Sequence, residues 1–462
     1  MLIWTGLAGF LLVGYLCMTK SFAYLGLPPL YLGEMVLGAF LLLKPRVSLG
    51  TWAGSLLRAS PLSSVGLALL LFISYGVWQL SRGVHGDSSS TLETLKYFVF
   101  NYYSMYLFLG IWIGLQAPHF LPNLVRTMAW FHGVYGLMWL AVLRDMTKVP
   151  PFIPGTELSI FGMPAGGAVA ILGLLCFERN LRSVWLVLAL NLAVTLGMQA
   201  RATWLGLAVG MLAWGLLTRR LGRVVATGVA GLAVLGMIEL SGVQLGPGRA
   251  TSFGEVVGRA IAPINMELAK EFSPNAKHAA GTVEWREVWW ESIWTSVHSR
   301  PMLEAFGHGY GFPLISLAPK AAQKDNEDVR TPHNAFYYAL GYTGWVGVAL
   351  FGALQLAILR LLWRSFRIAN EPAGLVFWFT FMAMAGFEGS FETPYRAIPF
   401  YLLIGMTMAP GLLLRRENWN IDSARNHHLT VAGHEHQRRG LARALAERRD
   451  PAAIHPTPTP SN

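Results

Sequence analysis

Long apolar runs, separated by short polar segments, make up most of the chain. A run of about 20 apolar residues can cross the hydrocarbon core of a bilayer, because a helix there satisfies its own backbone hydrogen bonds. The pattern therefore predicts an all-α polytopic membrane protein with about twelve transmembrane helices. The expected spans are 2–18, 28–43, 62–80, 97–115, 121–143, 160–177, 183–199, 202–218, 222–240, 334–359, 374–391 and 396–414.

One long segment interrupts this series of spans. Residues 1–240 hold the first nine predicted helices, 241–333 form a large loop, and 334–416 hold the last three. Loops of this length without regular structure are uncommon and usually functional. A polar, arginine-rich tail follows at 417–462, and its composition predicts that it is mostly disordered.

Part of the large loop has its own helical pattern. Within 283–297, apolar side chains recur at helical spacing, which predicts a tryptophan-rich amphipathic helix. Such a helix can lie in the membrane interface or pack on the end of the bundle, and the sequence leaves both interpretations open. The apolar positions are Trp285, Val288, Trp289, Ile293 and Val297.

The composition agrees with a bilayer as the solvent. The chain is 53% hydrophobic and 13% charged, whereas soluble proteins carry about 25% charged residues. The net charge of +11 does not indicate nucleic-acid binding, because no recognition motif accompanies it. Cys17 and Cys176 lie inside apolar runs and are expected to be packing residues. No metal or cofactor is expected, and the histidines of 427–436 are interpreted as part of a solvated tail.

The positions of Lys and Arg predict the orientation. They gather in the loops after the second, sixth, eighth and tenth spans and in the tail, while the intervening short loops are poorer in cations. Cytoplasmic loops carry the excess of positive charge. Both termini are therefore predicted to be cytoplasmic, and the loop 241–333 to be periplasmic, at a bacterial inner membrane.

Two charged residues stand inside or at the mouth of apolar runs, where charge is costly and often functional. Arg201 separates two runs at the predicted periplasmic surface, as a functional group or as a snorkelling arginine. Glu34 lies in the second span, and pairing within the bundle is its expected role. The loop adds Arg249, Arg286 and Arg330. Guanidinium groups bind phosphate oxygens bidentately, so several arginines converging with Arg201 would form a pyrophosphate site, although each alone could be merely solvated.

His333 lies where the loop meets the tenth span. Pro332 restricts Thr331 to extended conformations, and Asn334 can cap the following helix. An imidazole held at this rim can take a proton from a hydroxyl near neutral pH. A purely structural histidine is the alternative.

The pattern Gly307-His-Gly-Tyr-Gly311 predicts a tight turn centred on Gly309 that brings backbone amides close to another group. It is weak evidence for a phosphate loop, because it is not a Walker motif and no clear strand precedes it.

These pieces, in this order, resemble the O-antigen ligase and polymerase superfamily of bacterial membrane glycosyltransferases. The resemblance covers about 190–350 and rests on Arg201, Arg286, Gly307–Gly311, His333 with Asn334, and Gly341–Gly344. It implies a GT-C-like fold with a large periplasmic loop and a metal-independent, inverting transfer. The implied donor is a glycan on undecaprenyl pyrophosphate, and the implied acceptor is lipid A–core.

The resemblance also implies roles for residues. Arg201 and Arg286 would bind the donor pyrophosphate, and His333 would be the general base. Arg249 and Arg330 would be secondary phosphate ligands, although they match no motif of the family.

Several alternatives stay open. Glu388 and Glu392, near the last predicted periplasmic turn, could orient His333 or bind sugar. A polymerase that extends the lipid-linked glycan shares the donor chemistry of a ligase, as does a transferase to another acceptor. A secondary transporter is a remote alternative, because the chain shows no obvious internal repeat.

Overall fold

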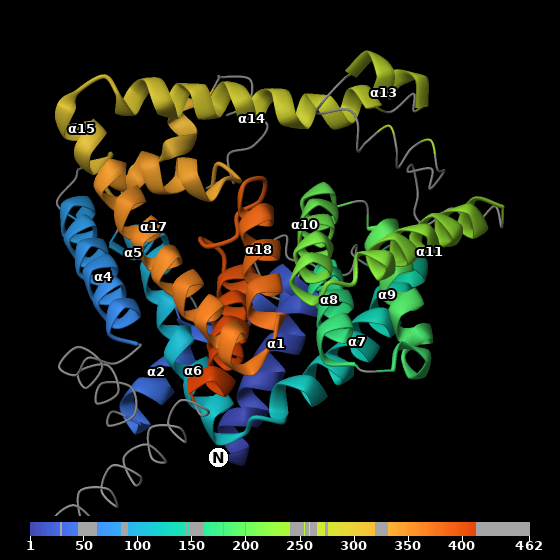
Figure 1. Cartoon of the computed structure of the whole chain (residues 1–462). Coiled ribbons are helices and arrows are strands. Elements are labelled where there is room, and N and C mark those ends of the chain that lie inside the picture. The colour runs from blue at the N-terminus through green and yellow to red at the C-terminus, as the bar shows by residue number, and fades with distance from the viewer. Residues whose placement is uncertain are drawn as a thin grey trace, which may run out of the picture. The chain divides into compact units, whose positions relative to one another are not determined.

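The fold is given by a computed structural model of the chain (Figure 1). Residues 1–410 form one compact unit, and 411–462 a second. Arg249, Arg330 and the tail 417–462 lie outside the described residues. The described residues are 1–27, 30–44, 62–84, 91–144, 146, 160–178, 180–198, 200–240, 254, 258, 266–272, 276–318 and 331–412.

The described residues are mostly helical. Single short strands, β1 (Gly26–Leu27) and β2 (Leu30–Tyr31), pair antiparallel between the first two helices. The last helix among the described residues covers 394–412. The other α-helices are α1 (Leu2–Ala23), α2 (Leu32–Leu43), α4 (Ser63–Val84), α5 (Thr91–Tyr102), α6 (Tyr106–Gln116), α7 (Phe120–Met138), α8 (Gly167–Phe177), α9 (Trp185–Gly197), α10 (Arg201–Thr218), α11 (Leu221–Leu240), α13 (Met266–Phe272), α14 (Ala276–Val297), α15 (Pro301–Phe306), α17 (Ala335–Ala369) and α18 (Ala373–Ala385). Short 3-10 or π turns are η1 (Tyr103–Met105), η2 (Trp139–Leu143), η4 (Leu181–Ser183) and η5 (Leu314–Leu317).

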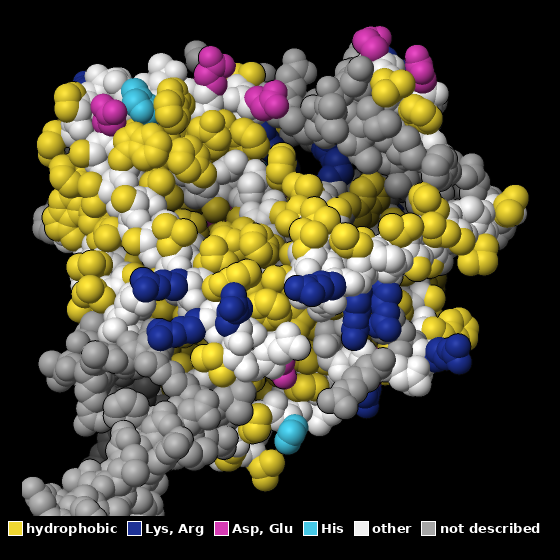
Figure 2. Space-filling model, viewed as in Figure 1, with side chains coloured by type: hydrophobic (Ala, Val, Ile, Leu, Met, Phe, Trp, Pro, Cys, Tyr) yellow, Lys and Arg dark blue, Asp and Glu magenta, His cyan; other side chains and the backbone are white. Residues whose placement is uncertain are grey.

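Five of the described helical segments are long and apolar enough to cross a membrane: α1, 63–83, 94–116, α10 and α17. Shorter apolar helices, among them α2, α8, α9 and α18, accompany them. The predicted all-α membrane fold is therefore confirmed, whereas the number of twelve spans and the side of the large loop stay predictions. Figure 2 shows apolar side chains over much of one face, with a band of Lys and Arg across its lower half.

The boundaries of the helices agree with the apolar pattern in some places and not in others. The predicted break near residue 200 is present, because α9 ends at Gly197 and α10 begins at Arg201. The predicted span 374–391 is too long, since α18 ends at Ala385 and leaves 386–393 as a non-helical turn. This turn carries glycines and the charged Glu388, which an apolar helix would have to bury unpaired.

The tryptophan-rich helix α14 packs on protein with one face. Trp289, Ile293 and Val297 are fully buried, and the Trp289 indole donates to the carbonyl of Leu314 at 2.9 Å. Val288 and Trp294, on the other face, are exposed. Figure 1 shows α14 running across the ends of α17 and α18. The predicted amphipathic helix is thus present, and its apolar stripe covers the end of the bundle.

The glycine turn of 307–311 packs against a kink in α17. Gly307 and Gly344 both adopt positive φ angles, 65° and 62°, which favour glycine. The amides of His308 and Gly309 donate to the carbonyls of Gly341 and Tyr342 at 2.9 Å. Two glycine segments that are distant in the sequence therefore form one backbone junction. Side chains of α4 complete this junction from the other side: Tyr75 donates to the Thr343 carbonyl, and Gln79 and Arg82 donate to that of Phe306.

Candidate active site

His333 occupies a strained position at the start of α17. Its φ angle is 53°, a left-handed conformation that side-chain-bearing residues seldom adopt. Asn334 caps α17 as predicted, because its side-chain oxygen accepts from the amides of Phe336 and Tyr337 at 2.9 and 3.2 Å. The Asn334 amide nitrogen donates to the Gly386 carbonyl at 2.9 Å. The backbone next to His333 is thus held between the start of α17 and the turn 386–393.

Helix α14 contacts the same segment through Trp290. The Trp290 indole donates to the Pro332 carbonyl at 2.7 Å and stacks on Tyr337 with ring centroids 5.3 Å apart. Arg286 lies one helical turn before Trp290 and therefore on the same side of α14. Its guanidinium reaches the Phe387 carbonyl at 3.4 Å. One helix thus positions both the backbone beside His333 and a cation at the turn 386–393.

The structure brings Arg201 and Arg286 together. Arg201 is the first residue of α10, and Arg286 comes from α14. Burial lowers the pKa of Arg286, and the positive charge of Arg201 lowers it further, while Glu388 opposes this effect. Two guanidinium groups that repel each other in a half-buried place form a ready site for an anion.

The same cations affect His333. Burial lowers the pKa of His333 to about 4, and the charges of Arg286 and Lys20 contribute in the same direction. The imidazole is therefore neutral near pH 7 and has a lone pair available to accept a proton. Lys20 stands at the C-terminal end of α1, next to Thr19, whose positive φ of 42° kinks that helix.

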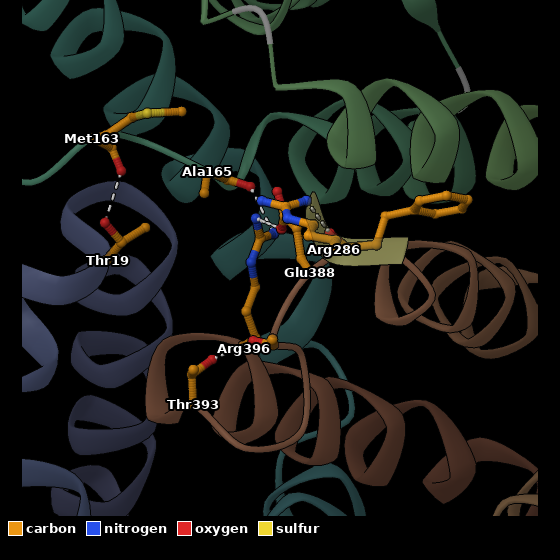
Figure 3. Close-up of polar contacts among 9 residues, drawn as sticks. Thr19, Met163, Ala165, Arg286, Glu388, Thr393 and Arg396 are labelled. Atoms are coloured by element: carbon orange, nitrogen blue, oxygen red, sulfur yellow. Dashed lines mark hydrogen bonds and ion pairs between the residues drawn. The ribbon is translucent and has the colours of Figure 1, made fainter. Parts of the chain in front are cut away.

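A further arginine belongs to this cluster. Arg396, in the helix 394–412, forms an ion pair with Glu388 and lies 3.5 Å from the Ala165 carbonyl. Figure 3 shows Arg396 and Arg286 approaching Glu388 from different elements. The sequence reasoning missed Arg396 and Lys20. For Arg396 a signal existed, because an arginine at the mouth of an apolar run was the criterion that selected Arg201.

The remaining predicted residues interact with groups outside this cluster. Glu392 is buried and accepts from the Phe391 amide at 3.0 Å, and burial raises its pKa to about 7. Glu34 pairs within the bundle, as expected, by accepting from the hydroxyls of Tyr102 and Tyr103 at 2.8 and 2.6 Å. The Gly309 amide is engaged by α17 and is not available to a phosphate. Within the described part of the chain, no three His, Cys, Asp or Glu side chains form a group that could hold a metal ion.

The fold and the site define an integral membrane protein in which Arg286, close to Arg201, lies near a neutral histidine. Residues 185–352 match the family model described as O-antigen ligase, and this segment contains Arg201, Arg286 and His333. The match supports an assignment to the O-antigen ligase and polymerase family, whose members are glycosyltransferase-like, on the strength of this segment. No curated protein sequence matches the chain.

Proposed function

We propose that the protein is an O-antigen ligase that transfers a glycan from undecaprenyl pyrophosphate to a hydroxyl of lipid A–core. The observation that carries this proposal is the convergence of Arg201 and Arg286 beside a neutral His333. A leaving pyrophosphate needs fixed positive charge, and an acceptor hydroxyl needs one positioned base. The cluster offers both within one region of the fold.

The reaction follows from these groups. His333 takes the proton of the acceptor hydroxyl, whose oxygen bonds to the anomeric carbon of the donor sugar. The bond from that carbon to the pyrophosphate oxygen breaks, and its electron pair leaves with the lipid pyrophosphate. Arg201 and Arg286 stabilise the charge that develops there, without rearranging during the reaction. Arg286 and Lys20 then favour release of the proton from His333.

The distribution of cations supports a periplasmic site. Arg201 and His333 stand at the N-terminal ends of α10 and α17. Exposed arginines gather at the opposite, C-terminal ends, where Arg219, Arg220 and Arg223 follow α10 and Arg360, Arg364 and Arg367 lie in α17. Positive charge marks the cytoplasmic side of a membrane protein. The proposed orientation therefore has the site in the periplasm and both termini in the cytoplasm of a bacterial inner membrane.

Reconstitution tests the proposal. Full-length protein in nanodiscs is mixed with undecaprenyl-pyrophosphate-linked glycan and lipid A–core, with and without EDTA. We expect glycan attached to lipid A–core in both cases, since the mechanism uses no metal. Longer lipid-linked glycan without transfer to lipid A–core would indicate a polymerase instead. No product with any acceptor would contradict the enzymatic role.

A further inference from the structure

The ion pair between Arg396 and Glu388 has unequal partners. The Arg396 side chain is 6% exposed, whereas that of Glu388 is 28% exposed. The Arg396 Nε atom is buried and has no hydrogen-bond partner among the described residues, and the same holds for Nε of Arg286. Buried donors are normally satisfied, and an unpaired one is destabilising. Both arginines therefore have donor capacity that no described residue uses.

Several of the described arginines of this region lie near one carboxylate. Arg201, Arg286 and Arg396 contribute guanidinium charges, and Glu388 is the carboxylate that acts on Arg286 and pairs with Arg396. Among the described residues, Arg286 and Arg396 therefore share one carboxylate, that of Glu388. A pyrophosphate diester, with about two negative charges, has the sign and the oxygen geometry that arginines bind.

The surroundings of Glu388 give it room to move. It lies in the non-helical turn 386–393, and its side chain is partly exposed to solvent. Arg396, in contrast, rises from a helix and also contacts the Ala165 carbonyl. In Figure 3 the carboxylate of Glu388 lies between elements that contribute the two arginines. The carboxylate can leave the pair for solvent, whereas the arginine cannot.

We propose that Arg396 is a third arginine of the donor pyrophosphate site, and that Glu388 is its resting counter-ion, which the pyrophosphate displaces. This inference rests on the proposed function, because it assumes a lipid pyrophosphate as the donor. Glu388 neutralises Arg286 and Arg396 in the empty site and competes with the incoming phosphate oxygens. Displacement moves the carboxylate toward solvent and turns the unused Nε donors toward the ligand.

The two partners then have opposite effects on affinity. Removing the competing charge with Glu388→Gln keeps the size of the side chain and frees the arginines, so affinity for pyrophosphate rises. Removing the ligand with Arg396→Gln lowers it. A static ion pair that only fastens the turn to the helix 394–412 predicts the same direction for both variants, because either change breaks the same contact.

Binding of undecaprenyl pyrophosphate without a glycan tests this inference. The full-length protein in nanodiscs is titrated with this probe and, separately, with undecaprenyl monophosphate. We expect Arg396→Gln to raise the Kd for the pyrophosphate roughly 10-fold or more, and Glu388→Gln to lower it by about 3- to 10-fold. Arg396→Lys should give an intermediate Kd, because lysine keeps the charge without the bidentate geometry.

A second Arg–Glu pair supplies the control. Arg126 and Glu178 form an ion pair of 2.7 Å elsewhere in the fold, and Arg126→Gln and Glu178→Gln should leave the Kd unchanged. Equal weakening by Arg396→Gln and Glu388→Gln, or no change in either folded variant, would overturn the inference. If Arg396→Gln fails to fold, Glu388→Gln and Arg396→Lys still decide it. Tight binding of the probe without transfer to lipid A–core would contradict the proposed function and leave this inference standing.

Discussion

The matched segment contains the glycine turn 307–311 and, about twenty residues later, His333. The two motifs differ in whether the polar groups around them have hydrogen-bond partners. At the glycine turn, the amides of His308 and Gly309 donate to α17, and Gln79 and Arg82 of α4 donate to the Phe306 carbonyl. At the histidine, nearby Arg286 keeps a buried Nε without a hydrogen-bond partner among the described residues. The backbone amides of the glycine turn are engaged in a structural junction, whereas buried guanidinium donors beside a neutral base are the groups that a ligand site requires.

The two histidines of these regions give the largest expected difference. His333→Ala removes the proposed base, so the rate of glycan transfer should fall by roughly 10²- to 10⁴-fold. His308→Ala, in the glycine turn, removes a contact with the Ser296 hydroxyl at 3.0 Å and a ring stacked on Phe312. It should keep near-normal transfer. Steady-state rates with purified, folded protein decide this, and near-normal transfer by His333→Ala would refute the base assignment.

The arginines give the next largest contrast. Arg286→Lys and Arg201→Lys keep the charge but lose the bidentate binding of phosphate, so kcat/KM for the donor should fall about 10- to 100-fold. Arg82→Lys, at the junction, weakens contacts with the carbonyls of Phe306 and Gly307. We expect a lower melting temperature and an unchanged donor KM. Unchanged donor kinetics in either Arg286→Lys or Arg201→Lys would remove that residue from the site.

A glycine-to-alanine substitution tests whether the junction between the glycine turn and α17 stabilises the fold. A Cβ at Gly344 would lie 2.5 Å from Ala305 and Gly307 backbone atoms, at a φ that disfavours alanine. Gly344→Ala should lower the free energy of unfolding by about 1–3 kcal/mol. Gly352→Ala, on the same helix, meets nothing within 4 Å and serves as the control. Equal melting temperatures for the two variants in detergent would show that the junction does not stabilise the fold.

The pH dependence gives the smallest expected effect. A base works when it is neutral, so kcat/KM should fall only as the pH drops through the pKa of His333, which burial and the cations Arg286 and Lys20 lower to about 4. Lys20→Gln removes one cation, raises this pKa and moves the acid limb to higher pH. If kcat/KM of Lys20→Gln falls at the same pH as in the wild type, the charge of Lys20 does not affect the pKa of His333.

Much of this account follows from the sequence, for physical reasons that differ between regions. The candidate roles of Arg201 and His333 follow from residue type and from position at the mouth of an apolar run, whereas that of Arg286 follows from the family resemblance. The break between α9 and α10 likewise follows from a polar interruption. What could not be predicted depends on the conformation of irregular segments and, for Lys20, on a long-range contact. The pairing of Glu388 with Arg396 and the approach of Lys20 to His333 require turns and a kink that apolar periodicity does not encode.

The most direct test of the central claim is the analysis of the glycans of a strain that lacks this gene and carries either the wild-type chain or His333→Ala. The account predicts long polymer that remains on undecaprenyl pyrophosphate and is absent from lipopolysaccharide, with restoration by the wild type and none by the variant. Lipopolysaccharide that carries single repeats in the deletion strain, or full restoration by His333→Ala, would contradict it.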